Sequence, residues 1–129
     1  MARERRRRGR LSRSGDFDRV YREGRSHSNR YLVLYAFPRS EERDEGEGQA
    51  RLGLSVGRKV GGAVDRNKVK RCLREAFWGL SDDLPEAHDF VIVARPDLGS
   101  LVEREGSAGA RSAVDEVIAA IPKPGGSGA

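Results

Sequence analysis

The part of this sequence with the clearest chemical meaning is a row of polar side chains, made of four cations and one amide. Residues 66–78 read RNKVKRCLREAFW, and their polar members at helical spacing are Arg66, Asn67, Lys70, Arg71 and Arg74. Like charges four residues apart destabilise an isolated helix by roughly 0.2–0.5 kcal/mol per pair. Phosphates along a nucleic acid would relieve that repulsion, so the pattern favours a polyanionic partner. The alternative is an ordinary exposed face of a basic protein, because runs of charge are common on surfaces.

The same segment carries a second, apolar face. Its apolar members recur at helical intervals and are Val69, Cys72, Leu73, Ala76, Phe77 and Leu80. This period predicts an amphipathic helix whose inner side packs on a core and whose outer side carries the cations. Asp65 stands just before the cations, where we expect it to cap the helix.

Aromatic residues in the first third of the chain predict a second binding surface. Alternate residues of a strand share a face, so Tyr31, Val33 and Tyr35 should line one surface of a strand over 31–37. Phe17 and Tyr21, on a short helix over 14–24, would complete a cleft. Lys59 and Arg13 would edge it. Single-stranded nucleic acid binds such surfaces by stacking. The alternative is that these rings are ordinary core between helix and sheet.

Residues that could perform catalysis or hold a metal are not apparent. The glycines of GLSVGRKVGG do not match a phosphate-binding loop. His27 and His88 lack partners at metal-ligand spacing, and no acidic cluster resembles a two-metal nuclease site. We therefore expect no catalytic residue and no metal site in the protein, which would bind nucleic acid without cutting it.

Composition agrees with an anionic partner and a reducing compartment. The 129 residues carry a net charge of +5 with a pI near 9.9, and the first ten include six arginines. Acidic residues gather instead over 41–47. The single cysteine, Cys72, lies on the apolar stripe and cannot form an intrachain disulfide. Without an apolar run long enough for a signal peptide or a membrane span, we expect a cytoplasmic protein with no membrane partner.

These elements predict one α/β domain. Residues 1–10 should form a disordered basic arm, 11–121 a single domain and 122–129 a disordered tail. After the helix over 14–24, the expected elements are strands over 31–37 and 51–56, the basic helix, a strand over 89–94 and a helix over 110–121. If the strands flanking the basic helix are parallel, a right-handed crossover is the default expectation.

Several segments, in order, resemble the protein subunit of bacterial ribonuclease P. They are SGDFDRVYREGRSHSNRYLVLYAF at 14–37, GLSVGRKVGGAVDRNKVKRCLREAF at 53–77 and DFVIVARP at 89–96. The resemblance implies an α/β (α+β) two-layer sandwich with a four-stranded sheet and three helices in the order αβββαβα. It also implies a left-handed βαβ crossover, in place of the right-handed default.

The resemblance further implies a role in an RNA enzyme. The protein would assist a catalytic RNA subunit in the endonucleolytic removal of the 5′ leader from precursor tRNA, with Mg²⁺ used by the RNA–protein holoenzyme. Residues expected to bind the catalytic RNA are Arg66, Asn67, Lys68, Lys70, Arg71 and Arg74. Those expected to line the leader cleft are Phe17, Tyr21, Tyr31, Val33, Tyr35, Lys59 and Arg13.

Two departures from the family pattern bear on these assignments. Lys68 stands where the family often has arginine, so charge is kept but bidentate phosphate contact is lost. The C-terminal segment lacks the basic extension or aromatic residues of some relatives. A generic structured-RNA-binding protein of ribosomal type, without a role in cleavage, is the alternative function.

Overall fold

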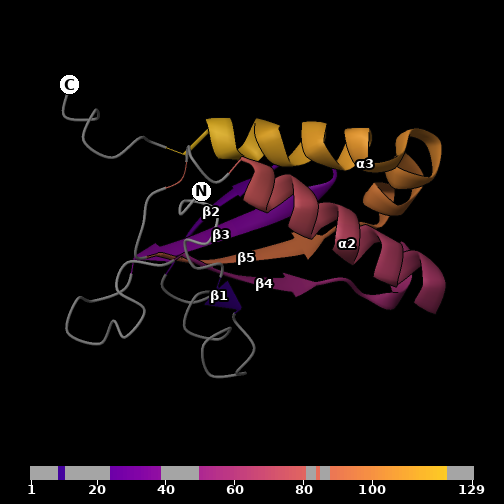
Figure 1. Cartoon of the computed structure of the whole chain (residues 1–129), viewed down its shortest axis with the longest axis horizontal. Helices are drawn as coiled ribbons and strands as arrows, with labels where there is room; N and C mark the ends of the chain where they lie inside the picture. Colours follow the sequence, from indigo (N-terminus) through magenta and orange to yellow (C-terminus); the bar gives the residue numbers. More distant parts are fainter. Residues whose placement is uncertain (1–8, 11–23, 39–49, 81–83, 85–87, 122–129) are drawn as a thin grey trace, which may run out of the picture.

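The computed structural model describes residues 9–10, 24–38, 50–80, 84 and 88–121 of the chain. Within them, a mixed sheet is covered on one face by two α-helices (Figure 1). Its longer strands are β2 (Arg25–Ser28), β3 (Leu32–Pro38), β4 (Arg51–Ser55) and β5 (His88–Ala94), and a two-residue strand β1 (Gly9–Arg10) lies at one edge. The helices are α2 (Ala63–Gly79) and α3 (Pro96–Ala119), and a 3-10 turn, η3 (Arg58–Val60), precedes α2.

The sheet has the strand order β1-β4-β5-β3-β2. Strand β5 is central; it pairs antiparallel with β3 and parallel with β4. The chain runs from β4 through α2 into β5, so the expected strand–helix–strand unit is confirmed. The hand of its crossover stays a prediction.

Residues that alternate along the strands divide the sheet into two faces. Leu34 of β3 and Ile92 of β5 are register partners, both fully buried on the face that α2 and α3 cover. Val91 belongs to the opposite face, away from the helices. On that face Asp89, which is 0% exposed, accepts two hydrogen bonds of 2.8 Å from Nε and Nη2 of Arg51. This bidentate pair joins β4 to β5 and compensates the buried carboxylate.

Helices α2 and α3 lie side by side over the sheet (Figure 1). Each turns an apolar stripe toward the sheet. The buried residues of α2 are Val69, Cys72, Leu73, Ala76 and Phe77. All five belong to the predicted stripe, while Leu80, its sixth member, is the half-buried C-cap. The predicted inner face of the basic helix is therefore confirmed.

Helix α2 begins earlier than its predicted cap. Its N-cap is Gly62, without a side-chain cap, and Asp65 lies in the first turn. The prediction that Asp65 caps the helix is therefore wrong; from within the first turn its carboxylate can still interact favourably with the helix dipole. Asp65 also lies close to Gly61: a Cβ atom added to Gly61 would lie 2.8 Å from the Cβ of Asp65.

Helix α3 is longer than the predicted helix over 110–121. It starts with Pro96 at its first turn and is interrupted at Gly106, whose φ of 64° is left-handed. At Gly109, a Cβ would lie 3.0 Å from the Leu101 side chain, so glycine lets the two halves of the helix approach each other. Leu98 and Leu101 of the first half are buried.

The α+β fold with four longer strands agrees with the sequence prediction. The structure differs at Gly9–Arg10, which the predicted basic arm includes and which pair with Arg51 and Leu52 as β1. The predicted helix over 14–24 and the tail over 122–129 lie outside the described residues. Of the helices that the structure describes, none combines the length and the apolar character needed to cross a membrane.

Candidate nucleic-acid interface

The outer side of α2 presents its cations to solvent. Asn67, Arg71 and Arg74 are exposed, whereas Arg66 and Lys70 are half-buried at the margin of the core. We call these five residues the basic face. Because the inner stripe fixes how the helix is rotated, the helical period directs these side chains away from the sheet. The structure thus brings together the five residues that the sequence predicted to share a face.

Lys68 lies apart from this row. At about 100° per residue, it projects on the opposite flank of the helix from Lys70 and Arg66. Its side chain is exposed. The six residues predicted to bind the catalytic RNA therefore wrap around the outer half of α2 and do not form a single line.

No cation of the basic face makes an ion pair with the part of the chain that the structure describes. The ion pairs there are Arg51–Asp89 and Arg30–Asp97, both remote in sequence from α2. Nε of Arg66 is buried and has no hydrogen-bond partner. A row of cations to which the described residues supply no ion pair favours an external polyanion and a salt-dependent interaction.

Lys59 adds positive charge near the start of α2. It is exposed in η3, which contacts both α2 and α3. Gly99 of α3 makes this packing possible, because a Cβ there would lie 2.3 Å from the carbonyl oxygen of Val60. The loop after β4 thus holds Arg58 and Lys59 beside the basic helix.

The sheet face away from the helices carries a second candidate surface, which we call the outer sheet face. Tyr35 and Phe37 of β3 and Val93 of β5 are half-buried there, around the fully buried Val91. Val33 shares this face by alternation with Tyr35 and pairs with Val93. Sequence reasoning missed Phe37, although its position two residues after Tyr35 was a sufficient signal.

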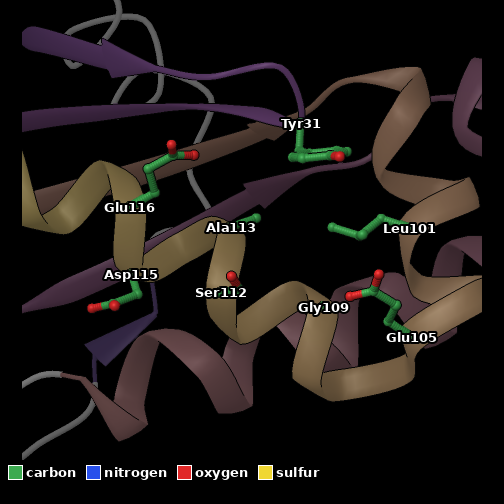
Figure 2. A pocket seen from close by; sticks show the side chains of 8 residues that line it. All are labelled: Tyr31, Leu101, Glu105, Gly109, Ser112, Ala113, Asp115 and Glu116. Atoms are coloured by element: carbon green, nitrogen blue, oxygen red, sulfur yellow. The ribbon is translucent and has the colours of Figure 1, made fainter.

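Tyr31 does not belong to that surface, and the prediction that it lines a cleft with Val33 and Tyr35 is wrong. Its ring packs against the helix-side core, beside Leu101 and Ala113 of α3 (Figure 2). It lines a pocket of about 440 Å³ at the bend of α3, with Glu105 and Glu116 among the other lining residues.

The turn before β3 explains the position of Tyr31. Oδ1 of Asn29 accepts hydrogen bonds from the backbone N–H groups of Tyr31 and Leu32, at 2.8 and 3.0 Å. Nδ2 of Asn29 donates to the Ala113 carbonyl at 3.0 Å and to Oε1 of Glu116 at 2.7 Å. These hydrogen bonds of Asn29, which we call the Asn29 clamp, tie the start of β3 to α3. Tyr31 lies just before β3, so the alternation of the strand, which the prediction had extended to Tyr31, does not apply to it.

The remaining residues predicted for the cleft, Arg13, Phe17 and Tyr21, lie outside the described residues. Across the described ranges, no group of three or more His, Cys, Asp or Glu side chains is arranged to hold a metal ion.

The comparisons with known proteins all find the same family. The family model described as Ribonuclease P matches residues 6–116. The chain is 42% identical over 86 residues to the ribonuclease P protein component of Oceanobacillus iheyensis, covering 67% of each chain. It is 44% identical over 86 residues to that of Clostridium acetobutylicum, covering 67% of this chain and 69% of the relative.

Solved structures agree with the sequence relatives. The RNase P protein of Staphylococcus aureus superposes with a TM-score of 0.75 at 29% identity, covering 88% of this chain and 95% of the other. That of Thermotoga maritima gives a TM-score of 0.74 at 32% identity, covering 88% and 98%.

Proposed function

The chain belongs to the ribonuclease P protein family, which implies an RNA partner in a holoenzyme, and we propose that it assists a catalytic RNA in removing the 5′ leader of precursor tRNA. In this proposal the RNA subunit performs the chemistry. The protein reduces the repulsion between two RNAs and holds the single-stranded leader.

The basic face of α2 supports a role in docking on the catalytic RNA. Its cations share one side of a helix whose other side is fixed in the core, and the described residues supply them no ion pair. Because packing fixes the helix backbone, cations along it can contact successive phosphates without the cost of ordering the backbone. This is the single observation that carries the proposal. Lys68, on the other flank, would extend the contact beyond the row.

The outer sheet face supports a role in holding the leader. Tyr35 and Phe37 are half-buried aromatic residues on a sheet, a surface on which bases of a single strand can stack. Val33 lies in the same row. Lys59 stays a predicted member of this site, although η3, which carries it, contacts α2 and α3 on the other side of the sheet. Phe17, Tyr21 and Arg13 stay predicted members of this site, whereas Tyr31 is removed from it because its ring packs under α3.

Mg²⁺ would enter through the RNA. Mg²⁺ held by the RNA would supply the activation of a water molecule for attack on the phosphodiester. The protein's cations would lower the electrostatic cost of bringing precursor and catalytic RNA together, so that the holoenzyme works at lower Mg²⁺ concentration than the RNA by itself.

A comparison of precursor and mature tRNA tests this proposal. With the wild-type protein, the holoenzyme should bind precursor tRNA more tightly than mature tRNA, because only the precursor has a leader. Tyr35→Ala removes one stacking platform and should weaken precursor binding by about 1–3 kcal/mol while leaving mature tRNA unaffected.

The control is a Tyr31→Ala variant, which removes an aromatic ring from the other side of the sheet. It should alter stability without changing the preference for precursor. If folded Tyr35→Ala protein loses affinity equally for both tRNAs, the outer sheet face does not bind the leader.

A further inference from the structure

Val64 is an unusual residue on the surface of α2. Its side chain is 80% exposed. Among the described residues, no other large hydrophobic side chain is exposed. Gly62 and Ala63, immediately before it, are exposed as well. Together they form a small apolar surface at the start of an otherwise highly charged helix.

The helical period places Val64 among polar residues of the outer side of α2. Asn67 and Lys68 follow it by three and four residues, and Arg71 by seven, so all three project near it. Neither Lys68 nor Arg71 makes an ion pair with the described residues. An isolated exposed valine needs no explanation on a bare surface, but this one lies inside a surface that we assign to RNA.

An apolar side chain at this point can do what the surrounding cations cannot. Arg and Lys contact phosphates and position an RNA without distinguishing one sequence or loop from another. The side chain of Val64 has no group to donate to a phosphate, and the largest apolar surfaces of an RNA are the faces of its bases. In folded RNA such faces become available where bases are unstacked in loops and bulges.

We propose that Val64 packs against an unstacked nucleobase of the catalytic RNA and so fixes where along that RNA the basic face docks. The inference rests on the proposed function, because it requires α2 to bind RNA. It adds a non-electrostatic contact to an interface that is otherwise built from charge. Asn67 and Lys68 would hold the backbone on either side of that base.

The test replaces Val64 with residues of matched shape or matched character. Val64→Thr keeps the branched shape but exchanges a methyl for a hydroxyl, and Val64→Leu keeps the apolar character. Affinity for the catalytic RNA is measured over a series of salt concentrations. Lys68→Ala reports on the electrostatic contribution, and Ala108→Ser, at an exposed site of α3, is the control for an unrelated polar change.

Val64→Thr should bind about fivefold more weakly at every salt concentration, with an unchanged log–log slope, because an apolar contact releases no counterion. Val64→Leu should stay within about twofold of wild type, since apolar contact is kept. Lys68→Ala should instead flatten the slope by about 0.7–0.9. Base-specific chemical probing should show a base protected by wild-type protein and by Val64→Leu but not by Val64→Thr.

Three results would overturn the inference. Unchanged affinity of Val64→Thr at all salt concentrations would place Val64 outside the interface. Lost affinity without any change in base protection would assign the contact to the sugar. A change in sedimentation of the free protein, with RNA binding intact, would make Val64 a contact between copies of this chain. Failure of wild-type protein to bind the RNA would instead refute the proposed function itself.

Discussion

Removing two cations from the centre of the basic face should flatten the salt dependence of RNA binding. Arg71 and Arg74 are exposed and have no ion pair with the described residues, so their replacement by alanine leaves no acid among those residues unpaired. Each phosphate contact contributes about −0.7 to −0.9 to the slope of log K against log salt concentration. The Arg71→Ala/Arg74→Ala protein should therefore have a slope shallower by about 1.4 to 1.8.

The assay is equilibrium binding to the catalytic RNA at four or more salt concentrations. A matched control is Arg104→Ala/Arg111→Ala, which removes the same charge from exposed positions of α3. Its net charge falls equally, so any effect of overall charge is shared by both variants. If the two double variants have the same slope, RNA binding depends on the total charge of the protein and not on the basic face of α2.

Further predictions concern stability. Leu73→Ala removes a fully buried side chain of the α2 stripe and should lower the free energy of unfolding by about 2–5 kcal/mol. Lys70→Ala, on the outer side, should lower it by less than about 1 kcal/mol. Denaturant unfolding measures both, and equal small losses would mean that the stripe is not part of the core. Asn29→Ala leaves two backbone N–H groups without their acceptor and releases α3, so it should cost about 1–3 kcal/mol, while the exposed Asn67→Ala should be nearly neutral in thermal unfolding. Similar melting temperatures for the two asparagine variants would contradict the clamp.

The sequence predicted best those features that depend on local periodicity. The inner stripe of α2 repeats over several turns, so Val69, Leu73 and Phe77 could be assigned to the core without knowing what they pack against. The alternation of β3 likewise predicted a shared face for Val33 and Tyr35, and Tyr35 does lie on the face opposite Leu34. In both elements the hydrophobic period and the backbone geometry give the same answer.

Long-range contacts account for what the sequence did not predict. Tyr31 was misplaced because Asn29 binds the Ala113 carbonyl, 84 residues away in the chain, and so sets where the regular strand begins. Asp89 has no local feature that marks it as buried, since its partner Arg51 is 38 residues away. The first half of α3 was missed because Gly99 and Gly106 weaken its helical pattern. Glycine lowers helix propensity, yet here Gly99 permits close packing on η3.

The same difference between local and long-range features applies to the candidate interface. The basic face could be predicted because it is one face of one helix. The outer sheet face is assembled from two strands that are distant in the sequence, β3 and β5, which is why Val91 and Val93 were absent from the predicted site although they pack beside Tyr35.

The decisive measurement is the cleavage of precursor tRNA by the cognate catalytic RNA, with and without this protein, at limiting Mg²⁺. Protein alone should cut nothing, and RNA alone should be slow. The two together should release the 5′ leader rapidly, and the Arg71→Ala/Arg74→Ala protein should need a higher concentration or less salt to do so. Cleavage by the protein in the absence of RNA, or an RNA rate that folded wild-type protein leaves unchanged, would show that the protein does not assist a catalytic RNA.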